Sequence, residues 1–133
     1  MASAFDVFLV TPEREVWSGQ ATMVVARGSE GEVGILAGHA PMLIQLGVGP
    51  LFVDPVEGDR IAAAIDGGFL HVVTNEGETR VDVLAEHAEL RDEIDLDLAR
   101  RQKEEAERKI QNHEDAEAIT ELAKAVTRID LAG

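Results

Sequence analysis

The sequence predicts an α+β fold: an N-terminal antiparallel β-sandwich, residues 1–88, followed by a C-terminal antiparallel two-helix hairpin, residues 89–133. Two observations support this prediction. The first part consists of short β-rich segments at intervals of about 8–12 residues, separated by glycine and proline turn signals, as in sandwiches and barrels. From about Asp92 onward, glycine and proline are absent until Gly133, and apolar residues recur at helical spacing.

The predicted strands are short, because glycine or proline follows most of the apolar runs. Ser18-Gly19, Gly47-Val48-Gly49-Pro50 and Asp66-Gly67-Gly68 are expected to be turns between separate strands. The strands expected on this basis are residues 5–10, 15–17, 21–26, 41–46, 51–53, 60–65, 69–73 and 79–84.

The two predicted helices, about residues 93–111 and 116–129, each carry a thin apolar stripe in which alanine is frequent. A fully buried Ile or Leu contributes roughly 1.5–3 kcal/mol, and alanine far less. Ordering each residue costs about 1–2 kcal/mol of backbone entropy. We therefore expect the hairpin to lie near balance between a docked and an undocked state.

The formal net charge of −14 argues against nucleic acid as a partner and against adsorption on anionic lipid. The chain has no cysteine, which excludes disulfides and thiolate chemistry. It also lacks an apolar run of about 18 residues, so we expect no direct membrane insertion.

Residues 28–41 form a glycine-rich corner that leaves Glu32 and His39 as its polar side chains. From the residues alone, His39 satisfying backbone groups and Glu32 facing solvent is the favoured interpretation. The four histidines lack metal-ligand spacing, and no phosphate-binding loop or nucleophile elbow is present. We therefore expect no catalytic residues, no metal and no enzyme activity.

Three segments carry a resemblance to a known family. They are residues 29–41, Ser-Glu-Gly-Glu-Val-Gly-Ile-Leu-Ala-Gly-His-Ala-Pro; residues 66–72, Asp-Gly-Gly-Phe-Leu-His-Val; and residues 81–86, Val-Asp-Val-Leu-Ala-Glu. In order and spacing they resemble the epsilon subunit of bacterial F-type ATP synthases, across essentially the whole chain. The family usually has proline where this chain has Ala37.

The resemblance implies a non-catalytic central-stalk (rotor) subunit of a proton-translocating ATP synthase, peripheral on the cytoplasmic face of the bacterial cell membrane. Its sandwich would bind the gamma subunit and the c-ring, with Glu32 and His39 contacting the ring. Its hairpin would undock, contact the alpha/beta subunits and inhibit ATP hydrolysis. The side chains expected to contact beta subunits are Arg100, Arg101, Lys103, Arg108 and Lys109, although partners within the hairpin would explain these cations equally well.

The resemblance also implies a regulatory ATP site on the hairpin. Pairing of antiparallel helices predicts that Asp95 lies opposite Arg128, with Lys124 nearby, which is by itself an ordinary ion-pair cluster. Some family members bind ATP through Ile/Leu-Asp-x-x-Arg-Ala and two basic residues. The matching positions here are Ile94, Asp95, Ala99, Lys124 and Arg128, but Leu98 stands where the arginine belongs, so we expect weak or absent ATP binding and no other cofactor.

A competing hypothesis from the residues alone is a free-standing β-sandwich adaptor or ligand-binding module with a dimerising helical hairpin. Composition fits this hypothesis equally well. Partners recovered with the chain distinguish the two, because an adaptor would not bring down alpha, beta, gamma and c subunits.

Overall fold

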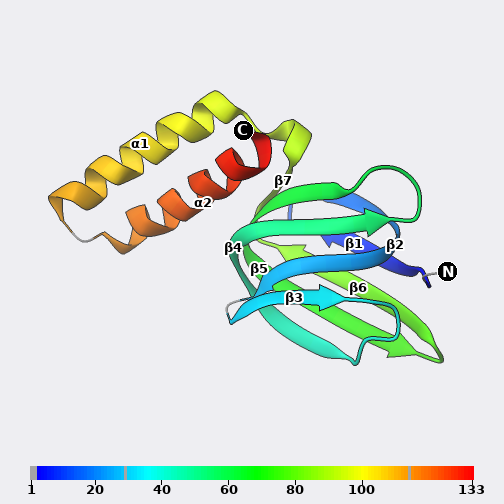
Figure 1. Cartoon of the computed structure of the whole chain (residues 1–133). Helices are drawn as coiled ribbons and strands as arrows, with labels where there is room; N and C mark the ends of the chain where they lie inside the picture. Colours follow the sequence, from blue (N-terminus) through cyan, green and yellow to red (C-terminus); the bar gives the residue numbers. More distant parts are fainter. Residues whose placement is uncertain (1–2, 29, 114) are drawn as a thin grey trace.

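The computed structural model describes residues 3–28, 30–113 and 115–133 (Figure 1). Ser29 of the glycine-rich corner and Glu114 of the predicted helix–helix turn lie outside the described residues, as do Met1 and Ala2. Within these ranges a strand-rich domain precedes two helices, which confirms the predicted α+β class.

The strands form one hydrogen-bonded ladder in the order β3-β2-β4-β5-β6-β1, and β1 also pairs with β2. The ladder therefore closes on itself. The β1–β6 pairing is parallel and the other pairings are antiparallel. The strands are β1 (Phe5–Val10), β2 (Glu15–Gly28), β3 (Gly31–Ile35), β4 (Met42–Pro55), β5 (Ile61–Asn75), β6 (Glu78–Ala85) and β7 (Ala88–Leu90), which pairs with β5.

Three of the predicted turns are wrong, because they lie inside the long strands β2, β4 and β5. These strands bend instead of ending (Figure 1). In β2 the register shifts between Ala21 and Met23, as at a β-bulge. In β5, Gly68 has φ +132°, and a Cβ there would lie 2.2 Å from the Leu84 carbonyl oxygen. Glycine marks bulges and close backbone approach as well as turns, and the sequence pattern does not distinguish them.

The buried hydrophobic core belongs to the strand-rich domain. Its members lie between Phe5 and Ala88, and the largest fully buried side chains include Leu9, Ile35, Leu51 and Leu70. These residues alternate with less buried ones along β1, β4 and β6, as expected where one face of a strand is buried. The core is therefore complete without a contribution from the helices.

The helical part begins later than predicted. The last strand runs to Leu90, a 3₁₀ turn η1 (Arg91–Glu93) follows, and helix α1 is Leu96–Asn112. Asp95 is its N-cap, accepting a hydrogen bond from the Leu98 amide at 3.0 Å. Helix α2, Ala116–Ala132, is capped in the same way by Asp115. The sequence places the helix start near Asp92 because that aspartate is also a plausible cap.

Helix α2 packs against β4 and β5, while α1 packs on α2 at a greater distance from the strands (Figure 1). The buried apolar residues of both helices are alanines: Ala99 and Ala106 in α1, and Ala118 and Ala125 in α2. Such a seam buries little apolar area, in agreement with the thin stripes of the sequence. In the described part of the chain, neither helix has the length and hydropathy needed to cross a bilayer.

Candidate functional site

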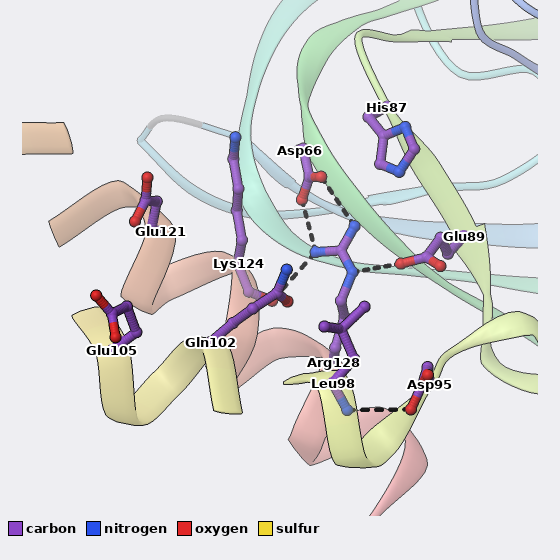
Figure 2. Close-up of a pocket in the computed structure, with 10 residues that line it drawn as sticks. All are labelled: Asp66, His87, Glu89, Asp95, Leu98, Gln102, Glu105, Glu121, Lys124 and Arg128. Atoms are coloured by element: carbon purple, nitrogen blue, oxygen red, sulfur yellow. Dashed lines mark hydrogen bonds and ion pairs between the residues drawn. The ribbon is translucent and has the colours of Figure 1, made fainter. Parts of the chain in front are cut away.

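A pocket of about 470 Å³ lies where the hairpin meets the strand-rich domain (Figure 2). Its lining comes from both sides. On the side of the strand-rich domain are Asp66 of β5, Glu89 of β7 and His87, which directly precedes β7. The hairpin side consists of Asp95, Leu98, Gln102, Glu105, Glu121, Lys124 and Arg128.

Arg128 is the centre of this pocket. Its Nη1 and Nη2 donate to the two carboxylate oxygens of Asp66 at 2.9 and 2.8 Å, and its Nε donates to Glu89 at 2.5 Å (Figure 2). The side chains of Arg128 and Asp66 are 9% and 8% exposed. The fork of the guanidinium matches a carboxylate, which makes this a strong, geometrically specific contact.

Burial by itself would lower the pKa of the Arg128 guanidinium, because it disfavours the charged form. The hydrogen bonds that Arg128 donates to Asp66 and Glu89 outweigh burial, and the pKa of Arg128 is raised above its usual value. The side chain therefore stays charged, and its charge is balanced by the two carboxylates beside it.

The predicted pairing of Asp95 with Arg128 is wrong. Both residues line the pocket, but Asp95 caps α1 and Arg128 reaches across to the strand-rich domain. Helix geometry alone could not reveal this, because the partners Asp66 and Glu89 lie outside the hairpin. Asp66 directly precedes two glycines of β5 and belongs to one of the sequence motifs, but nothing in that motif indicates an ion pair with Arg128.

The residues considered for ATP binding are only partly brought together. Asp95, Lys124 and Arg128 line the pocket, as does Leu98 at the position of the family arginine. Ala99 is buried, 1% exposed, and Ile94 follows η1; neither is among the lining residues. The lining holds five carboxylates and two cations, an environment that disfavours a polyphosphate.

The cations of α1 have mixed surroundings. Arg100 pairs with Asp97 at 3.8 Å, Arg108 with Glu105 at 2.5 Å and Lys109 with Glu121 at 3.4 Å. The Glu105 partner raises the pKa of Arg108. Among the residues that the structure describes, Arg101 and Lys103 form no ion pair within 4.0 Å.

Glu32 lies in β3, and His39 lies in the loop that follows this strand. Glu32 is exposed near its start and lines a cavity of about 300 Å³ with Leu43 and Gln45. His39 follows its end, and its Nδ1 donates to the Ala40 carbonyl oxygen at 2.8 Å. Across residues 3–28, 30–113 and 115–133, no hydrogen bond joins Glu32 to His39, so they do not form a catalytic pair.

Two threonines from the β5–β6 turn region fix the loop that carries His39. The Gly38 amide donates to Thr79 Oγ1 at 2.7 Å, and Thr74 Oγ1 donates to the His39 carbonyl oxygen at 2.9 Å. The two hydroxyls lie 3.0 Å apart. Sequence reasoning missed these positioning residues, because they lie 35 or more residues from the loop.

The outer face of β4, β5 and β6 carries exposed apolar side chains. Phe69 lies opposite Gln45 and Leu84 in the register, and Leu43 lies two residues from Gln45 on the same face. Leu43, Phe69 and Leu84, which we call the outer patch, are 64%, 48% and 52% exposed. Exposed large apolar side chains that gather on one face are typical of an interaction surface.

Comparison with known proteins identifies the family. The family model described as ATP synthase, Delta/Epsilon chain, beta-sandwich domain matches residues 4–110. The ATP synthase epsilon chain of Streptomyces coelicolor is 41% identical over 128 residues, covering 96% of this chain and 100% of that protein. The chain belongs to the ATP synthase epsilon-chain family.

Other relatives agree. The ATP synthase epsilon chain of Thermobifida fusca is 42% identical over 128 residues, covering 95% of this chain and 90% of that protein. A chain in the cryo-EM structure of Euglena gracilis mitochondrial ATP synthase, OSCP/F1/c-ring, superposes with a TM-score of 0.78 at 30% identity. That match covers 97% of this chain and 80% of the Euglena chain. The epsilon-chain family favours an ATP synthase subunit over a free-standing adaptor.

Proposed function

We propose that this chain is a non-catalytic rotor subunit of a proton-translocating ATP synthase, peripheral on the cytoplasmic face of the bacterial membrane. The strand-rich domain binds the gamma subunit and the c-ring, and so couples ring rotation to the catalytic head. Membership of the epsilon-chain family supports the assembly as a whole. The outer patch is the observation that supports a direct contact with the gamma subunit.

The outer patch suits the gamma subunit. It consists of large apolar side chains on rigid strands, and burial of such side chains in the centre of an interface supplies most of the affinity. The acidic end of the domain, where Glu32 is exposed, suits basic groups on the c-ring. An exposed ion pair of this kind contributes about 0–1 kcal/mol. Glu32 and His39 would therefore set the register of the contact with the c-ring and add little to its affinity.

The hairpin is a regulatory element in this proposal. Undocked from β4 and β5, it would extend toward the alpha/beta subunits, where Arg101 and Lys103 are cations available for acidic partners. We expect ATP to bind the docked hairpin weakly or not at all, because the pocket is acidic and Leu98 supplies no donor.

The test of the gamma contact is binding of purified gamma subunit to the tagged chain. Replacing Phe69 by Asp places a charge in the outer patch and is expected to weaken binding at least about tenfold. Val56→Asp is the matched control. Val56 is an apolar residue of similar exposure, 54%, but it lies at the β4–β5 turn, outside the outer patch. Binding by Phe69→Asp at wild-type strength would contradict the proposed interface.

A further inference from the structure

Arg128 is the charged side chain that α2 buries against the strands. The other buried residues of α2 are Ala118, Ala125 and Thr127, and the Thr127 hydroxyl donates within the helix to the Ala123 carbonyl oxygen. Arg128 in contrast leaves its helix and meets Asp66 on β5 and Glu89 on β7 (Figure 2). One guanidinium therefore links α2 to β7 and β5, through Glu89 and Asp66, which lie 39 and 62 residues away in the chain.

The apolar contact beneath α2 is loose by comparison. An open groove of about 320 Å³ lies between α2 and β4, with Val48, Pro50 and Phe52 on one side and Val126 and Leu131 on the other, and Arg27 and Asp130 also line it. Apolar side chains along a solvent-open groove bury little area, so they contribute little to the attachment of α2. The hairpin is thus held by polar contacts at one side of α2 and has an open groove at the other.

We propose that the Arg128 cluster, formed by Arg128, Asp66 and Glu89, holds the hairpin in its docked position, so that docking depends on an ion pair within the chain and needs no bound nucleotide. The inference rests on the mobile hairpin of the proposed function and names what controls it. Removing Arg128, or both carboxylates together, leaves a buried charge without its partner, which is the costly way to break such a contact.

The donors of Arg128 explain why no nucleotide is needed. Nη1, Nη2 and Nε are each engaged by a carboxylate oxygen at 2.5–2.9 Å. A phosphate would have to displace Asp66 and Glu89 and then lie beside both of them, and like charges at such distances repel strongly. Carboxylates of the strand-rich domain thus take the position at the guanidinium that a phosphate would need.

The experiment measures docking directly in the full chain. The sequence has no native cysteine, so Glu57→Cys on the strand-rich domain and Glu107→Cys on α1, both exposed, accept spin labels without further changes. Pulsed electron paramagnetic resonance then gives the distance distribution between the labels. We expect one narrow population for the otherwise wild-type chain, with no change on adding magnesium ATP.

Three variants isolate the cluster. Arg128→Gln, and separately the double variant Asp66→Asn with Glu89→Gln, are expected to raise the undocked fraction roughly a hundredfold and broaden the distribution. Lys124→Gln is the matched control, because Lys124 lies one turn earlier on the same pocket and its loss removes the same charge. It is expected to leave the distribution unchanged.

The proposal is overturned if Arg128→Gln or the double variant keeps the wild-type distribution, if Lys124→Gln releases the hairpin as strongly, or if ATP shifts the distribution. Trp17 fluorescence, reporting on β2 of the strand-rich domain, shows in the same samples that this domain remains folded. ATP hydrolysis by the complex separates the two ideas. Release in Arg128→Gln without reduced hydrolysis contradicts the inhibitory role in the proposed function but leaves the Arg128 cluster in place.

Discussion

At the scale of single residues, the fold depends on a few positions where no side chain fits. Gly68 is the clearest of them, since its φ is +132° and its missing Cβ leaves room for the Leu84 carbonyl oxygen. Such backbone conformations are essentially restricted to glycine. The closeness of β5 to β6 at this point therefore depends on the absence of one carbon atom.

Replacing Gly68 by Ala is expected to lower the free energy of unfolding by at least about 2 kcal/mol, through backbone strain and the clash with β6. Gly34→Ala is the control, because a Cβ there meets nothing within 4 Å and its φ lies outside the left-handed range. Urea unfolding followed by Trp17 fluorescence measures both. Equal stability of the two variants would show that β5 relaxes without cost.

Residue chemistry also decides which site predictions hold. Asp95, Lys124 and Arg128 do line one pocket, because a predicted antiparallel hairpin brings its open ends together. The partners of Arg128 could not be predicted, because a guanidinium can pair with any carboxylate near it. Asp66 and Glu89 lie near Arg128 only in the tertiary fold. Sequence periodicity reports faces of a helix but carries no information on what lies opposite them.

At the scale of elements, the structure divides into a strand-rich domain with its own core and a hairpin that rests on it. The core runs from Phe5 to Ala88, and α2 meets β4 and β5 mainly through small residues and the Arg128 cluster. The alternation of β1 and β6 and the stripes of both helices were sufficient to predict these elements. The lengths of β2, β4 and β5 were not predictable, because a glycine that bends a strand resembles a glycine that ends one.

A chain ending after Glu93 is therefore expected to fold. It retains every member of the core and the β7 pairing with β5, and loses only the seam with α2. Thermal unfolding should remain cooperative, and near-ultraviolet circular dichroism should keep the Trp17 signal of the full chain. Loss of cooperative unfolding in the shortened chain would mean that the hairpin is part of the folding unit.

At the scale of the whole molecule, a strand-rich domain with its own core carries a helical hairpin, and little apolar area is buried between the two. Family membership assigns this molecule to the ATP synthase. We propose that the outer patch anchors the strand-rich domain and that the Arg128 cluster restrains the hairpin. The three sequence motifs were specific enough to predict the family because they span β3, β5 and β6 in order. These motifs carry no information on the hairpin, because its docking depends on contacts between residues far apart in the chain.

The most direct measurement of the central claim is ATP hydrolysis by the assembled complex, with the full chain and with a chain lacking residues 94–133. Because the strand-rich domain keeps its core and its outer patch, both complexes should assemble with the same subunits. The account predicts that removal of the hairpin raises hydrolysis. Unchanged hydrolysis in a complex of the same composition would contradict it.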